Sequence, residues 1–210
     1  MNRAYLPFAI ALAVPGAPLA AQEPEQNAAQ MPESYTFLQA VRNGDAAAIQ
    51  SIVANPSSTA INTRDPRTGE GALHILVQRR DLRSLAFLLT RSARPDIQTG
   101  DGTTPLALAA RLGWVEGAEQ LLARGARVDL ANRRGETPLI LAVQARQLSA
   151  PERLAMISLL LGQGADPNRQ DSYAGYSALD YARQDRRSPE ILRALEAQPQ
   201  RDAAAVGPNP

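Results

Sequence analysis

Two short motifs recur along the chain at a nearly constant spacing. The first ends in a leucine, and its copies place that residue at Leu73, Leu106, Leu139 and Leu179. The second is a leucine pair closely followed by Ser-Ala or Gly-Ala, and its copies begin at Leu88, Leu121 and Leu160. The first three leucines lie 33 residues apart, and the pair follows 15 residues later in two copies and 21 residues later in the third. A repeat of this length predicts a stack of similar units, each stabilised mainly by its neighbours.

The copy around residue 106 predicts two short helices separated by a turn. Thr104 suits a helix N-cap because its hydroxyl can accept an early helical N–H, and Pro105 then occupies the first turn, where its missing N–H does no harm. Gly113 can adopt the positive φ that ends a helix. Hydrophobic residues make up 44% of the chain but aromatic residues only 4%, so the core must consist of Leu, Ala, Ile and Val, which favours packed helices over a sheet sandwich.

The best copy of the first motif, Gly102-Thr103-Thr104-Pro105-Leu106-Ala107-Leu108-Ala109-Ala110, resembles the start of an ankyrin repeat. The later Leu-Leu-x-x-Gly-Ala motif resembles its end, and the resemblance covers residues 34–198. It implies an all-α solenoid of about five units, in which each unit has a short β-hairpin finger, an inner helix, a turn and an outer helix. The expected units are about 34–66, 67–99, 100–132, 133–172 and 173–198, and the first and last are degenerate caps.

The third full copy carries six extra residues between its two motifs, around residues 147–152. Ser149 and Glu152 have the spacing of a capping box, which predicts that the outer helix starts there and runs through Leu161. We favour a tolerated lengthening of the loop over an added contact surface.

The first 21 residues have the layout of a secretory signal peptide. Arg3 precedes an apolar stretch over residues 6–14, and small residues follow at 17–21. The apolar stretch is too short and too rich in proline for an uncleaved membrane anchor, so we expect cleavage after Ala21, or after Ala20, and a periplasmic or secreted protein. Residues 22–32 predict a disordered spacer and residues 199–210 a disordered tail around the repeat domain at 33–198.

The charge and the residue types exclude several functions. The formal net charge is +1, and removal of residues 1–21 takes away Arg3 and leaves 21 basic and 21 acidic residues, so we expect neither a nucleic-acid partner nor, after cleavage, a membrane partner. The chain has no cysteine and a single histidine, His74, and its aspartates lack the spacing of a calcium loop, so we expect no metal and no cofactor.

The resemblance gives His74 a structural role, in which it ties neighbouring fingers together. Trp114 either anchors a partner or, as we favour, covers a helix turn.

The resemblance implies a binding face that consists of the finger tips and the concave face of the inner helices. We therefore expect a monomeric, non-enzymatic adaptor for a protein partner. An inhibitor or immunity-type protein that masks an enzyme or toxin in the same compartment is the alternative, and a hydrolase is disfavoured because no catalytic motif is present. The expected contact residues are Arg67, Thr68, Glu70, Gln78, Arg79, Asp101, Thr103, Arg111, Leu112, Arg133, Arg134, Glu136, Gln144, Tyr173, Tyr176, Gln184 and Asp185.

Overall fold

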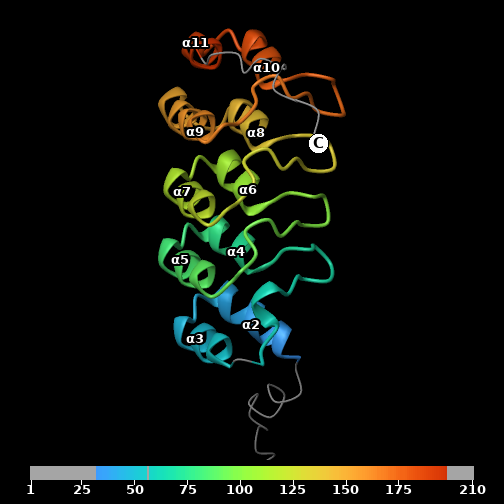
Figure 1. Ribbon diagram of the computed structural model, residues 1–210, viewed down its shortest axis with the longest axis vertical. Helices are drawn as coiled ribbons and strands as arrows, with labels where there is room; N and C mark the ends of the chain where they lie inside the picture. Colours follow the sequence, from blue (N-terminus) through green and yellow to red (C-terminus); the bar gives the residue numbers. More distant parts are fainter. Residues whose placement is uncertain (1–31, 56, 198–210) are drawn as a thin grey trace, which may run out of the picture. The chain divides into compact units, whose positions relative to one another are not determined.

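The computed structural model describes residues 32–55 and 57–197, and this part of the chain is an all-α stack of helix pairs (Figure 1). Each expected unit contains one antiparallel pair, although the exact unit boundaries stay predictions. The ten α-helices and one 3₁₀ turn of the described residues are α2 (Glu33–Asn43), α3 (Ala46–Ala54), η1 (Ala60–Asn62), α4 (Ala72–Arg79), α5 (Leu82–Thr90), α6 (Pro105–Leu112), α7 (Val115–Ala123), α8 (Pro138–Gln144), α9 (Ala150–Gly162), α10 (Ala178–Gln184) and α11 (Pro189–Glu196).

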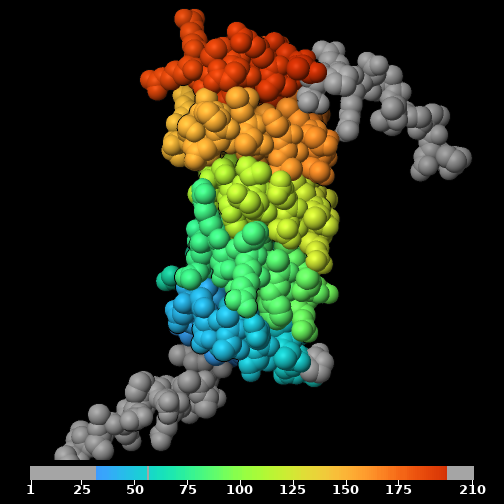
Figure 2. Space-filling view, turned by 90° about the vertical axis from the view of Figure 1, so that its left-hand side faces the viewer, coloured from blue at the N-terminus to red at the C-terminus, as the bar shows by residue number. Residues whose placement is uncertain are grey.

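The helices form two layers, because nearly every helix packs against its equivalent in the next pair. The inner layer contains α2, α4, α6, α8 and α10, and the outer layer contains α3, α5, α7, α9 and α11 (Figure 1). Figure 2 views the outer layer and shows the pairs following one another in chain order along the stack. The main helix contacts of the described residues therefore join helices of one pair or of adjacent pairs, as expected for a repeat protein.

The repeated leucines lie in the core between the two layers. Leu106 and Leu139 of the inner layer and Leu121 and Leu160 of the outer layer are fully buried. Each such side chain contributes roughly 1.5–3 kcal/mol through the removal of its apolar surface from water. The small side chains of α6, such as Ala109, are also fully buried and allow α4 and α8 to approach it closely.

The helix ends agree with the sequence prediction. The Thr104 hydroxyl accepts the N–H of Ala107 at 3.1 Å, and Gly113 ends α6 at φ 64°. Arg80 takes the same left-handed conformation at the end of α4, and its guanidinium donates to the Leu112 carbonyl at 2.6 Å. The predicted capping box at Ser149 and Glu152 is confirmed, and α9 begins at Ala150.

The fingers project from the same side of the stack, at the right in Figure 1. A backbone hydrogen bond joins the first and last residues of each finger, and the four fingers are residues 65–70, 99–103, 132–136 and 171–176. Single antiparallel bridges flank the first and fourth fingers, and no extended strand forms within the described residues. The expected β-hairpins are thus tight loops, because their arms are too short for a ladder of hydrogen bonds.

The expected signal peptide (1–21), nearly all of the expected spacer (22–32) and the expected tail (199–210) lie outside the described residues. Within residues 32–55 and 57–197, no helix is both long enough and apolar enough to cross a membrane.

Candidate functional site

Backbone hydrogen bonds join the finger tips into a continuous row. The N–H of Gly100 donates to the Thr68 carbonyl at 2.9 Å, the N–H of Arg133 to Asp101 at 3.0 Å, and the N–H of Ser172 to Arg134 at 2.8 Å. One bond therefore connects each finger to the next. This row holds the finger tips in fixed relative positions before any ligand binds. Binding therefore loses less conformational entropy than it would with mobile loops.

Glycine at one position of each finger makes this close approach possible. Gly69, Gly102 and Gly135 lie 33 residues apart and have φ values of 74°, 85° and 76°. A Cβ atom on Gly69 or Gly135 would lie 2.4 Å from a backbone nitrogen of the next finger, and one on Gly102 would lie 2.9 Å from such a nitrogen. Both the backbone conformation and the contact with the next finger therefore require glycine.

His74 links the first finger to the second. Its Nδ1 accepts the N–H of Gly71 at 3.2 Å, so Nε2 carries the proton and donates to the Thr103 carbonyl at 2.9 Å. Burial lowers the pKa of His74 against the opposing effect of these bonds, which keeps the ring neutral. The structural role expected for His74 is confirmed.

Asp171 organises the fourth finger. One of its oxygens accepts the N–H groups of Tyr173, Ala174 and Gly175, and the other accepts the Tyr181 hydroxyl at 2.5 Å. Burial acts to raise the pKa of Asp171, but these bonds outweigh it and hold the pKa below its usual value. Burial and the adjacent carboxylate raise the pKa of Tyr181 to about 12. The pair supports the loop, and no cluster of three or more metal-ligating side chains occurs in the described part of the chain.

The fourth finger also exposes the aromatic surface of this row. Tyr173 is 80% exposed, and the Arg134 guanidinium of the third finger lies over its ring at 5.3 Å from the centroid. Tyr176 packs edge-on against Tyr181, with ring centroids 5.5 Å apart, and keeps a large part of its own surface exposed. An arginine stacked on an exposed tyrosine offers a partner a rigid apolar face beside a charge.

A family model described as "Ankyrin repeats (3 copies)" matches residues 37–132 and, in an overlapping second match, residues 73–171. The matched residues make up more than half of the chain. The chain belongs to the ankyrin-repeat family. Ankyrin repeats are generally protein–protein interaction modules and are typically non-enzymatic scaffolds, so the family points to a protein partner.

The ankyrin fold separates the expected contact residues into two neighbouring groups. We call the first group the finger surface, which consists of Arg67, Thr68, Glu70, Asp101, Arg133, Arg134, Tyr173 and Tyr176. The second group lies at the C-terminal ends of the inner helices, and we call it the turn edge, which consists of Gln78, Arg79, Arg111, Leu112, Gln144 and Gln184. One inner-helix length, about 12 Å, separates the two groups. Gln78 bridges them, since its amide donates to Glu70 at 2.7 Å.

Three residues expected on this ankyrin surface are instead buried, which corrects the sequence prediction. Thr103 and Glu136 lie beside the N-caps of α6 and α8, where Thr103 donates to Asp101 and Glu136 accepts from Asn132. Asp185 is held by an ion pair with Arg153. All three sit where a loop meets a helix, so their polar groups are used inside the ankyrin unit. Trp114 is also buried and packs on Gly117, so it covers a helix turn as favoured above.

Sequence reasoning missed Arg153, the least exposed arginine of the described ankyrin units. Its guanidinium donates to Asp185 at 2.9 Å, to the Ser188 hydroxyl at 3.3 Å and to the Val143 carbonyl. Burial acts to raise the pKa of Asp185, but the hydrogen bonds from Arg153 and from the Arg187 N–H, together with the charges of Arg153 and Arg146, outweigh it and lower the pKa of this carboxyl. The sequence did contain a signal for the burial of Arg153. Arg153 lies as far before its leucine pair as Trp114 lies before Leu121, so the two residues occupy equivalent positions in the repeat.

Proposed function

We propose that this chain is an exported ankyrin-repeat adaptor that binds a protein partner through its finger surface. The observation that carries the proposal is the hydrogen-bonded row of finger tips, which holds exposed arginine and tyrosine side chains in a fixed arrangement. Tyrosine and arginine are enriched at the energetic centres of protein interfaces. The family is the second support, since ankyrin repeats generally bind proteins.

The finger surface favours a partner that presents carboxylates next to apolar side chains. Arg67 is exposed at the first tip and Arg133 and Arg134 at the third, and a guanidinium pairs with a carboxylate through two parallel hydrogen bonds. Tyr173 supplies apolar area that loses little conformational freedom on binding.

Affinity capture from an extract of the source cells, followed by mass spectrometry, tests the proposal. The wild-type chain should retain a specific protein, and Arg133→Ala with Arg134→Ala, or Tyr173→Ala alone, should weaken its binding by about 1 kcal/mol or more with an almost unchanged thermal melt. Arg193→Ala is the matched control, since Arg193 is exposed on the outer helix α11. Full capture by the finger variants together with loss of capture by the Arg193 variant would move the binding face to the outer helices. If the partner is an enzyme that binding inhibits, the inhibitor alternative replaces the adaptor.

Export is supported by the sequence pattern of residues 1–21, with a basic residue, an apolar stretch and small residues in that order. N-terminal sequencing of the protein recovered from the periplasm or the medium should begin near Gln22. Recovery of a cytoplasmic protein that still begins at Met1 would refute export, and the adaptor would then require a cytoplasmic partner.

A further inference from the structure

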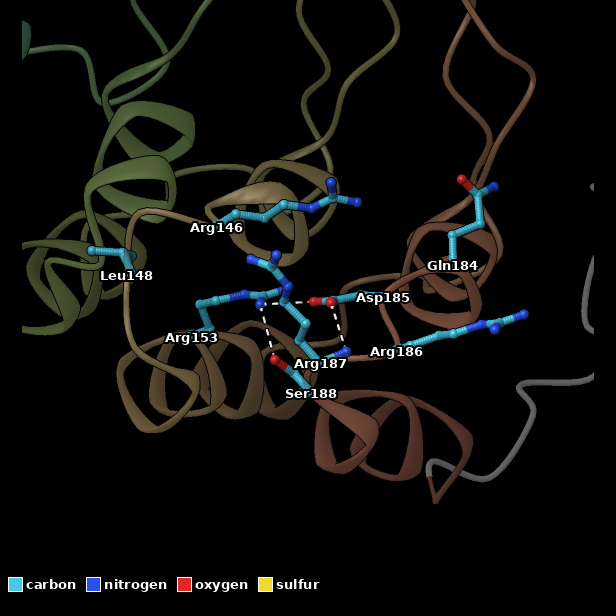
Figure 3. A pocket seen from close by; sticks show the side chains of 8 residues that line it. All are labelled: Arg146, Leu148, Arg153, Gln184, Asp185, Arg186, Arg187 and Ser188. Atoms are coloured by element: carbon cyan, nitrogen blue, oxygen red, sulfur yellow. Dashed lines mark hydrogen bonds and ion pairs between the residues drawn. The ribbon is translucent and has the colours of Figure 1, made fainter.

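A cavity of about 450 Å³ lies at the turn edge between the α8–α9 pair and the α10–α11 pair (Figure 3). Its walls come from the loop before α9, from the first turn of α9 and from the loop between α10 and α11. This volume lies within the range of small-ligand sites in proteins. It is also many times the roughly 30 Å³ share of one water molecule in the liquid, so it has room for part of a chain and not only for a bare ion.

Positive charge dominates the lining of this cavity. Four arginines, Arg146, Arg153, Arg186 and Arg187, line it together with one carboxylate, Asp185. Arg153 already neutralises Asp185, since the two form a buried ion pair at 2.9 Å. The other three arginines are exposed and form no ion pair with any residue that the structure describes. Figure 3 shows Arg186 extending away from Asp185, which leaves Arg146 and Arg187 as the cations of the cavity that form no ion pair with a described residue.

The insertion in this repeat forms part of the cavity, since Leu148 of the inserted loop is one of the lining residues. The insertion lengthens α9 to 13 residues, whereas α5 and α7 have 9, and the added turn carries Arg153 into the stack. Leu148 of the inserted loop lies against Gly113 of the preceding unit, and Gln147 donates to the Arg111 carbonyl at 2.8 Å. The loop is thereby fastened to its neighbour, and Arg146 and Leu148 are held at the mouth of the cavity.

We propose that this cavity is a second binding site, which takes a carboxylate side chain of an acidic polypeptide segment. Charge complementarity supports this occupant, because Arg146 and Arg187 can each offer a planar pair of N–H donors to a carboxylate. Leu148 provides an apolar wall for the methylene groups of a glutamate, and the Gln184 amide can bond a peptide group of the same segment. The site lies on the turn edge and does not depend on the finger surface of the proposed function.

Binding of a fluorescent oligoglutamate peptide to the full chain, followed by anisotropy, tests this site. Wild type should bind this peptide and not an oligoglutamine peptide of equal length. Arg146→Gln with Arg187→Gln removes two charge-assisted contacts and should weaken binding by about tenfold to a hundredfold. Arg133→Gln with Arg134→Gln on the finger surface is the control that removes the same number of charges, and both it and Arg193→Gln should bind as wild type does. Peptide-induced shifts of the backbone amide resonances should be centred on residues 184–188.

Four outcomes would overturn the proposal. Equal weakening by the cavity variant and by Arg193→Gln would mean that only net charge attracts the peptide, and weakening by the finger variant alone would place the peptide on the fingers. Saturable binding of inorganic phosphate without binding of the peptide would make this a small-anion site. Tighter peptide binding after removal of residues 198–210 would identify the chain's own end as the occupant. The finger variant also keeps the two proposals distinguishable, since each can fail while the other holds.

Discussion

The turn between α6 and α7 and the turn between α8 and α9 occupy equivalent places in adjacent units but are built differently. In the first, Gly113 reverses the chain at φ 64° and Trp114 covers Gly117, so the buried contacts are apolar. In the second, residues 145–149 make a longer loop, and Arg153 replaces the tryptophan with a buried ion pair to Asp185. Both residues are 4% exposed. This buried position of the repeat therefore accepts either an aromatic side chain or a charged one, provided that the charged side chain has an ion-pair partner.

The difference shows that an insertion in a repeat can add a contact to the next unit. Arg153 connects α9 to the loop that precedes α11, and Leu148 connects the inserted loop to the preceding unit. The interpretation of the insertion as a simple loop lengthening accounts for neither contact. The inserted loop therefore contacts the preceding unit, and Arg153, directly after it, contacts the next one.

The largest expected effect comes from Arg153→Ala. This change leaves the Asp185 carboxylate buried without its partner, and breaking such a pair destabilises proteins by about 3–5 kcal/mol. Urea unfolding followed by circular dichroism measures the loss. Arg183→Ala is the control, because its pair with Asp180 is exposed and should contribute no more than about 1 kcal/mol.

The double variant Arg153→Met with Asp185→Leu sharpens this result. It removes both charges and keeps apolar volume, so it should recover much of the lost stability. If the double variant were as unstable as Arg153→Ala, the α9–α11 junction would depend on the hydrogen bonds themselves and not on the balance of buried charge.

The next effect tests the apolar core of the α6–α7 unit, on the other side of the comparison. Leu106 is buried in α6, and Leu106→Ala should destabilise the stack by about 2–5 kcal/mol through lost burial and a residual cavity. The exposed Leu82 is the matched control, and Leu82→Ala should change stability by no more than about 0.5 kcal/mol. An unchanged urea midpoint for the Leu106 variant would contradict the assignment of this residue to the core.

Two glycines in adjacent fingers extend the comparison to the end of the stack. A Cβ atom on Gly135 would collide with the backbone of the next finger, whereas Gly175 has a similar φ of 69° but a Cβ atom there would have no described neighbour within 4 Å. Gly175→Ala should cost about 1–2 kcal/mol for the left-handed backbone alone. Gly135→Ala should cost about 1 kcal/mol more, because it also disturbs the bond between Ser172 and Arg134. Equal losses in thermal melts would mean that contact between the fingers contributes little.

The smallest effect is the pH dependence of the buried pair. Because the pKa of Asp185 in the folded chain lies below its ordinary value of 3.8, this group stabilises the fold in full above that pH. Its contribution is lost as the pH falls from 3.8 through the lower, folded pKa. Urea midpoints of Asp185→Asn should therefore fall less steeply below about pH 4 than those of wild type. The slope should not vanish, since Asp171 and Asp101 also have lowered pKa values.

The sequence by itself determined the helix pairs and their caps. The 33-residue spacing, the Thr-Pro starts and the capping box at Ser149 are readable because they depend on residues close together in the chain or on a motif that repeats. The role of His74 was implied only by the resemblance to ankyrin repeats, since its Thr103 partner lies 29 residues away. The finger glycines fall at the same period, so their positions could have been read from the sequence, although their contacts could not.

Only the tertiary structure decided which polar residues are used inside the stack and which face a partner. Asp185 meets Arg153 across 32 residues, and Thr103 and Glu136 turn inward beside their helix caps. The insertion also shifts the register of one unit, so its effect on the next unit depends on how the two pack. Such long-range contacts depend on the angle and spacing between units, which local propensity does not encode. A buried polar group is stable only where the stacking of the units brings it a partner.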